Sequence, residues 1–198
     1  ASLGYFISPL FSMLLGRLFF NEHFNRIQLA AIVLAAIGIF WLALPAGQVP
    51  WVALLLTLTF GLYGLLRKTA PLDALPGLAL ETLLLLPFAL AYLGWLAQQG
   101  QLVFGSLPPL LLATLIGSGI VTTVPLLLFA AGARRISMSD LGIIQYVSPT
   151  IQFLLGLFLF GEAFDVSRFI GYGWVWLGVA VYLFGIWHQQ RSKRMPVE

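Results

Sequence analysis

Cysteine is absent from the 198 residues, and charged side chains are scarce, at 9% of the chain. Without cysteine the chain can form no disulfide, use no thiol as a nucleophile and hold no metal through thiolates. Hydrophobic residues make up 60% of the chain, and the mean hydropathy is +0.98. A small water-soluble globule cannot hide that much apolar surface. The composition therefore excludes a soluble enzyme, a nucleic-acid-binding domain and a disordered chain.

Apolar runs long enough to cross a membrane follow one another along the whole sequence. A spanning helix needs about 20 mostly apolar residues, and these runs are too long for barrel strands and show no strand alternation. The sequence therefore predicts an all-α polytopic membrane helix bundle without a separate soluble domain. The polar residues 189–198 are expected to form a loose tail. The seven predicted spans are residues 2–20, 27–45, 51–66, 76–97, 108–132, 141–160 and 167–188.

Basic residues occur at every second joint between these spans. The joints 46–50, 98–107 and 161–167 contain neither lysine nor arginine. By the positive-inside rule the basic joints are cytoplasmic, so the C-terminus is predicted to be cytoplasmic and residue 1 to lie on the outer side. The net charge of +3 is explained in the same way, and no nucleic-acid partner is expected. The basic residues concerned are Arg26, Arg67, Lys68, Arg134, Arg135, Arg191, Lys193 and Arg194.

An internal repeat appears when the chain is shifted by 140 residues, with nine identities over residues 8–38. Ser8-Pro9 aligns with Ser148-Pro149. Asn21 aligns with Gly161, and these residue types best tolerate the left-handed conformation that ends a helix. The small residues Ala31 and Gly38 align with Gly171 and Gly178, seven apart on one face, where they would let helices approach closely.

The repeat divides the chain unequally. Residues 51–188 form a complete five-helix unit, residues 1–46 the last two helices of an earlier unit, and residues 189–198 a cytoplasmic tail. Three helices, in about ninety residues, are then expected before residue 1. A five-helix unit reverses its orientation at each repeat, so helices 2–20 and 141–160 should run in opposite directions. Inverted repeats are typical of transporters, whose substrate site lies between them near mid-membrane.

Polar residues share one face of helix 141–160, because Gln145, Ser148 and Gln152 have helical spacing. Such faces either bond neighbouring helices or line a water-filled pathway. Pro9 and Pro149 would each remove a backbone hydrogen bond, which makes them hinge candidates. The candidate substrate-pathway residues are Tyr5, Ser8, Ser12, Tyr63, Glu81, Gln145, Tyr146, Ser148 and Gln152.

Glu81 is the only acid well inside an apolar run, about 7 Å from the cytoplasmic end of its helix. It could carry a proton, bind a cationic substrate or pair with a basic group such as Lys68. Tyr63 has glycines on both sides, which suits either a cavity lining or tight packing. Glu22 and Glu162 follow helix ends in matched loops and are interpreted as structural.

Several of these segments together resemble the RarD-type permeases of the drug/metabolite transporter superfamily, which carry EamA-type repeats. The resemblance implies ten helices, cytoplasmic termini, a bacterial inner-membrane location and export or exchange of small metabolites or drugs. The first three helices of that pattern lie outside this sequence, so the chain is expected to be N-terminally truncated. The matching segments are residues 4–10, 14–16, 60–68, 81–87, 145–153 and 160–162.

The leading functional hypothesis is a transporter of small, partly apolar solutes that works by alternating access. The alternative is a non-transporting membrane subunit or a nonfunctional truncated product. An intramembrane enzyme is disfavoured, because no histidine lies inside a span to serve as a base. The expected partners are the lipid bilayer and a small-molecule substrate; no cofactor, no metal and no particular oligomeric state are predicted.

Overall fold

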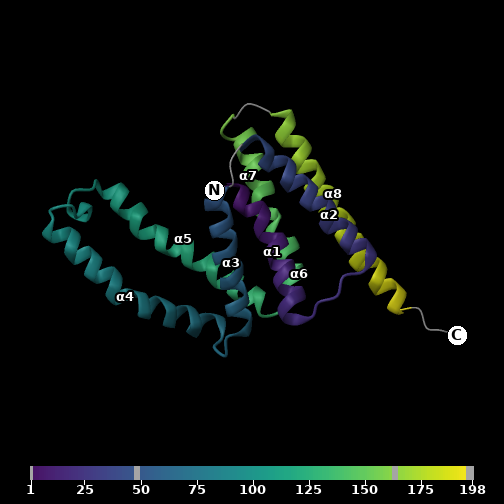
Figure 1. Cartoon of the computed structure of the whole chain (residues 1–198). Coiled ribbons are helices and arrows are strands. Elements are labelled where there is room, and N and C mark those ends of the chain that lie inside the picture. The colour runs from purple at the N-terminus through teal and green to yellow at the C-terminus, as the bar shows by residue number, and fades with distance from the viewer. Residues whose placement is uncertain (1, 47–49, 162–164, 195–198) are drawn as a thin grey trace. The chain divides into compact units, whose positions relative to one another are not determined.

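A computed structural model describes residues 2–46, 50–161 and 165–194 (Figure 1). Within these ranges the chain is all-α, with no strand. Six of its helices are long and apolar enough to cross a membrane, and the stretch Gly4–Phe20 is a shorter apolar helix. The all-α membrane bundle predicted from the sequence is therefore confirmed. The helices are α1 (Ser2–Phe20), α2 (Arg26–Ala43), α3 (Trp51–Thr69), α4 (Ala74–Gln98), α5 (Pro109–Ala133), α6 (Met138–Gln145), α7 (Val147–Phe158) and α8 (Val166–Arg194).

The repeated helix ends have the backbone conformation that the sequence predicts. Asn21 has φ of 51°, and the N–H of the following Glu22 reaches the carbonyl of Gly16 at 3.2 Å. Gly161 has φ of 61° in the matching place. Asparagine and glycine are the residues that adopt this conformation at least cost. Glu162, the repeat partner of Glu22, lies outside the described residues.

The chain divides into two compact units, of which the first comprises residues 1–65 and 136–198. Its closest helix pair is α2 and α8, which lie side by side in Figure 1. A Cβ placed on Gly38 would lie 2.7 Å from the Gly171 carbonyl oxygen, and one on Gly178 would lie 2.8 Å from that of Ala31. The helices are thus antiparallel, and the small residues permit the close approach that the repeat predicts.

Helix α1 also packs against a helix that runs in the opposite direction. Gly142 of α6 faces the Pro9 carbonyl, and Gly16 faces Met138 at the start of α6. Because low numbers on α1 meet high numbers on α6, these two helices are antiparallel. Helix α3 is parallel to α1, since Gly4 meets Ala53 and Ser8 meets Thr57.

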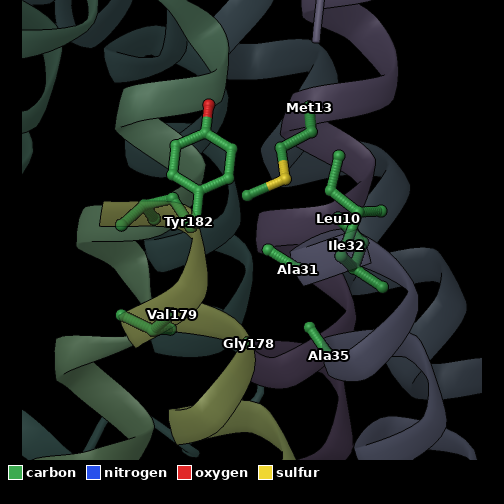
Figure 2. Close-up of a pocket in the computed structure, with 9 residues that line it drawn as sticks. Leu10, Met13, Ala31, Ile32, Ala35, Gly178, Val179 and Tyr182 are labelled. Carbon is green, nitrogen blue, oxygen red and sulfur yellow. The ribbon is translucent and has the colours of Figure 1, made fainter. Parts of the chain in front are cut away.

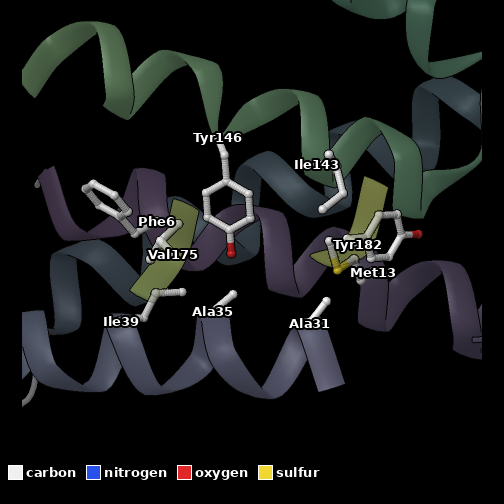
Figure 3. Close-up of a cluster of buried hydrophobic side chains, with 9 residues drawn as sticks. All are labelled: Phe6, Met13, Ala31, Ala35, Ile39, Ile143, Tyr146, Val175 and Tyr182. Atoms are coloured by element: carbon white, nitrogen blue, oxygen red, sulfur yellow. The ribbon is translucent and has the colours of Figure 1, made fainter. Parts of the chain in front are cut away.

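The buried centre of the first unit is apolar. Figure 3 shows a cluster in which side chains of α1, α2 and α8 meet those of α6 and Tyr146. Burial of such side chains contributes packing rather than a hydrophobic drive where the outer surface faces lipid. The cluster consists of Phe6, Met13, Ala31, Ala35, Ile39, Ile143, Tyr146, Val175 and Tyr182.

The second unit, residues 66–135, is the hairpin of α4 and α5 with the last residues of α3. Arg134 joins the two ends of the hairpin, because its guanidinium donates to the carbonyls of Ala70 and Leu72 at 2.7 and 2.6 Å. The same guanidinium lies 3.3 Å from the Asp73 carboxylate. Lys68 adds a bond from its Nζ to the Ala133 carbonyl at 3.1 Å. Cationic side chains thus fasten the helix ends, where carbonyls lack helical partners.

The span predicted at 141–160 is present as the apolar stretch Met138–Phe158, with one irregularity that the sequence did not predict: α6 ends at Gln145 and α7 begins at Val147. Pro149 has no N–H to bond the Gln145 carbonyl and its ring crowds that carbonyl, so the break precedes it by one turn. The tail is also not loose from residue 189, because α8 continues to Arg194. Within it the Arg191 guanidinium lies 5.2 Å from the Trp187 ring centroid, a favourable cation–π contact.

Candidate functional site

The polar face of α1 is covered by protein over most of its length. Ser8 and Ser12 are buried, whereas Tyr5 is 51% exposed. The Ser8 hydroxyl donates to the Gly4 carbonyl at 2.9 Å and lies 3.5 Å from the Thr57 hydroxyl on α3. Ser8 is thus bonded within α1 and lies against α3, while its role in a solute pathway stays a prediction.

The corresponding face of α6 and α7 is much more open. Ser148 and Gln152 are exposed, and Gln145 is half-buried. The Gln152 amide nitrogen lies 3.5 Å from the Ser148 hydroxyl, which is the longest such contact in this region. No hydrogen bond among the described residues joins this face to that of α1. The two predicted faces are therefore equivalent in sequence but differ in what covers them.

The junction between α6 and α7 holds two polar atoms without partners. Within the described part of the chain, the Gln145 side-chain oxygen and the Tyr146 hydroxyl are buried and make no hydrogen bond. Thr150 is fully used, since its hydroxyl donates to the Tyr146 carbonyl at 2.8 Å and accepts from the Trp176 indole at 3.0 Å. Unpaired buried polar atoms are uncommon and call for an explanation.

The two hinge candidates have different surroundings, although both proline side chains are fully buried. Helix α1 continues through Pro9 without interruption, whereas the helix around Pro149 is broken at Tyr146. Whether either proline acts as a hinge stays a prediction. The break makes Pro149 the better candidate, because a bend there disturbs fewer helical hydrogen bonds.

Glu22 links the end of α1 to the start of α6. Its carboxylate accepts from the N–H of Met138 at 2.7 Å, from the N–H of Ser139 at 3.0 Å and from the Ser139 hydroxyl. The open N-terminus of a helix attracts a carboxylate in this way. Gly16 makes room for it, since a Cβ there would lie 2.8 Å from the carboxyl carbon. The structural role predicted for Glu22 agrees with this geometry.

A polar cavity of about 340 Å³ lies beside Glu22. It is formed by the α1–α2 connection, the start of α6 and the far end of α8, so these three segments share one end of the first unit. The alternation of basic residues predicts the same grouping. The residues that line it include Glu22, His23, Gln28, Asp140, Tyr182 and Gln189.

The hollow between α1, α2 and α8 is closed. Figure 2 shows the hollow between α1, α2 and α8, where Leu10, Met13, Ile32, Val179 and Tyr182 fill the gap and leave no volume for a water molecule. A solute pathway through these helices therefore needs a different arrangement or a different face.

Glu81 pairs with a buried arginine, Arg67. Its carboxylate lies 3.5 Å from the Arg67 guanidinium, and the Arg67 side chain is only 4% exposed against 42% for Glu81. Arg67 also donates to the Ala74 carbonyl at 3.2 Å. Because α4 begins at Ala74, Glu81 lies about 10 Å along the helix axis. Gly77, one turn before Glu81, leaves the space that the guanidinium occupies.

The burial of Arg67 was missed at the level of sequence, where Arg67 and Lys68 looked alike as neighbouring interfacial cations. The only signal was a glycine four residues before an intramembrane acid. Tyr63 is half-buried and stacks on Phe60 with ring centroids 6.3 Å apart. Its neighbour Gly61 receives the ring of Phe11 from α1. The glycine beside Tyr63 is thus used for packing, while the role of Tyr63 in a pathway stays a prediction.

Comparison with known proteins gives a family match over most of the chain. Residues 49–184 match the EamA-like transporter family. The chain is 43% identical over 198 residues to the uncharacterized transporter PA0485 of Pseudomonas aeruginosa and 40% identical over 195 residues to the protein RarD of Escherichia coli. It is 36% identical over 197 residues to the chloramphenicol-sensitive protein RarD of Pseudomonas aeruginosa.

These matches cover 99%, 98% and 98% of this chain, respectively. The chain spans 66%, 66% and 63% of the lengths of these relatives, and 61% of the uncharacterized transporter YojE of Bacillus subtilis. No solved structure matches it. With its apolar helices, this identifies an integral membrane protein. The chain therefore belongs to the EamA-like transporter family and is of the RarD type, which confirms the resemblance seen in its sequence.

Proposed function

We propose that the protein carries a small, partly apolar solute across the bacterial inner membrane by alternating access. The observation that carries this proposal is the reciprocal contact of α2 and α8. Ala31 meets Gly178 and Gly38 meets Gly171, while the repeat equates Ala31 with Gly171 and Gly38 with Gly178. Such reciprocity is the signature of a two-fold relation, here between two copies of one helix within a single chain. Repeats related in this way can exchange inward-open and outward-open shapes.

The chemistry of the solute is inferred from the open face of α7. Ser148 and Gln152 are exposed on a helix that crosses the membrane, where polar side chains facing lipid are costly. We assign this face, with the unpaired Gln145 oxygen, to the solute pathway. Hydroxyl and amide groups without a net charge suit a neutral or zwitterionic solute that can hydrogen-bond. Since one relative is named chloramphenicol-sensitive, amphipathic antibiotics belong among the solutes tested beside amino acids.

A flux assay on the intact protein in proteoliposomes tests this proposal. Gln152→Leu removes an amide from the assigned face. We expect it to lower the flux of a transported solute by about tenfold, because the solute loses one hydrogen bond between uncharged groups. Gln98→Leu makes the same change at an exposed position near the end of α4 and should leave flux unchanged. Equal flux for both variants would remove the α7 face from the pathway.

Glu81 is assigned a coupling role, as the carrier of a proton or the site of a cationic substrate. The Glu81 carboxylate is partly exposed, so a solute or proton can reach it. A proton or cation that binds there must compete with the Arg67 guanidinium for the carboxylate. Glu81→Gln keeps the side-chain shape. We expect lost flux at a normal protein level and a normal melting temperature. Normal flux, or flux lost only together with folding, would leave Glu81 as a structural partner of Arg67.

A further inference from the structure

The hydroxyl of Tyr146 makes no stabilising interaction in this conformation. The residue is 3% exposed, and its hydroxyl has no hydrogen-bond partner among the described residues. Figure 3 shows the ring descending from the α6–α7 junction, with the hydroxyl directed toward the helix that carries Ala35 and Ile39. Those neighbours are apolar, so the hydroxyl loses its hydration and gains nothing in return.

The repeat supplies an internal control for this position. The residue that aligns with Tyr146 is Phe6, which is also buried, at 5% exposure, in the same cluster. Phe6 packs edge-on against Tyr172 with ring centroids 4.9 Å apart. A phenyl ring therefore satisfies the packing need at the matched site of the first repeat. The hydroxyl of Tyr146 is an addition that packing does not require.

Tyr146 is the one residue between α6 and α7, although its carbonyl still accepts from the Thr150 N–H at 3.3 Å and from the Thr150 hydroxyl at 2.8 Å. Its N–H reaches back only three residues, to the Ile143 carbonyl at 3.1 Å, and the next helix starts at Val147. Pro149 cannot bond the Gln145 carbonyl. A change of bend between residues 145 and 149 would swing the Tyr146 side chain while breaking few helical hydrogen bonds.

We propose that Tyr146 is a conformational positioning residue, whose hydroxyl finds a hydrogen-bond acceptor only in a second conformation reached by bending at the α6–α7 junction. In the conformation described here the unpaired hydroxyl raises the free energy, and in the second the new hydrogen bond lowers it. The hydroxyl thus keeps the two states close in free energy, which exchange between them requires. This inference rests on the proposed function in so far as transport uses both states.

Tyr146→Phe in the intact protein is the decisive variant. Removing an unpaired buried hydroxyl should raise the melting temperature of the solute-free protein. It should also slow hydrogen–deuterium exchange of the amides of residues 146–148 and 150, because the bent state becomes rarer. Solute flux should fall several-fold while solute binding is retained. Phe6→Tyr places the same hydroxyl in the matched site, where α1 is unbroken, and it should lower the melting temperature without changing exchange at the junction.

Two outcomes would overturn the proposal. A lower melting temperature for Tyr146→Phe would mean that the hydroxyl is already satisfied in the resting state, for example by a buried water molecule. Unchanged exchange at residues 146–148 and 150 would mean that the hydroxyl does not bias the bend. Because melting and exchange are measured without a solute, they still test the hydroxyl if no flux is found, in which case only the transport proposal fails.

Discussion

At the scale of single residues, Glu22 and Gly16 form a matched pair. The carboxylate of Glu22 reaches the first amides of α6 because Asn21 turns the chain and Gly16 leaves room beside α1. One acidic side chain thereby closes a helix N-terminus that begins 116 residues later in the sequence. The N-terminus of α6 has a local cap as well, since the Ser137 hydroxyl accepts from the Asp140 N–H at 2.9 Å. Glu22 thus accepts from the N–H groups of Met138 and Ser139, and Ser137 accepts from that of Asp140.

Glu22→Gln should destabilise the protein by about 1–2 kcal/mol, because one of the two acceptor oxygens and the favourable charge at the helix end are lost. Thermal unfolding in detergent measures this. Asp140→Asn removes an acid from the first turn of the same helix and serves as the control with a smaller expected effect. A larger effect for Asp140→Asn would mean that charge at the α6 terminus matters more than the Glu22 contacts.

At the scale of helices, α2 and α8, which align with each other in the internal repeat, pack together through small residues. Glycine and alanine bring the backbones so close that the hydrogen of each glycine is the only substituent that fits. Asn25 supports the same pair, since its side-chain amide donates to the Gly185 carbonyl at 3.2 Å. Contacts of this kind drive helix association where apolar burial cannot.

Gly178→Val should destabilise the protein by about 1–3 kcal/mol through overpacking against Ala31 and Ala35. Gly173→Val is the matched control on α8, because nothing lies within 4 Å of a Cβ placed there. Both changes alter helix propensity equally, so the difference between their melting temperatures isolates the contact. If both variants melt alike, the close approach of α2 and α8 does not contribute to stability.

At the scale of the whole molecule, the positions of the charged residues predict the path of the chain through the membrane. Basic joints alternate with joints that lack lysine and arginine, and the helix directions within the first unit agree with that alternation. Within the second unit, Arg67, Lys68 and Arg134 fasten the cytoplasmic side of the hairpin as that topology predicts it. The same residues thus close helix ends and, by the positive-inside rule, are predicted to orient the chain.

Single cysteines test this topology cleanly, since the chain has no cysteine of its own. Ser106→Cys, between α4 and α5, should react with a membrane-impermeant maleimide in intact cells. Thr69→Cys, at the end of α3, should react only after the membrane is opened. Both side chains are exposed, so access differs only by membrane side. The opposite labelling pattern would place the C-terminus outside the cytoplasm.

Most helix boundaries could be predicted from the sequence to within a few residues, because Gly, Pro and basic residues mark where apolar runs end. The left-handed Asn21 and Gly161 were predictable for the same local reason. The break at Tyr146 was not, although Pro149 was a known irregularity, because α1 tolerates Pro9 in the same repeat position without a break. A proline in the sequence therefore indicates where a helix is weakened. The packing of neighbouring helices determines whether the helix breaks at that point.

The sequence by itself determined that this is a membrane helix bundle, since membrane insertion reads hydropathy along the chain, and its internal repeat predicted that matched helices run in opposite directions. Only the tertiary structure decided that Ser8 is covered while Ser148 is open, and that Glu81 meets a buried Arg67. Those outcomes depend on the rotation of each helix about its axis and on contacts between helices distant in sequence. No local pattern of residues sets either of them.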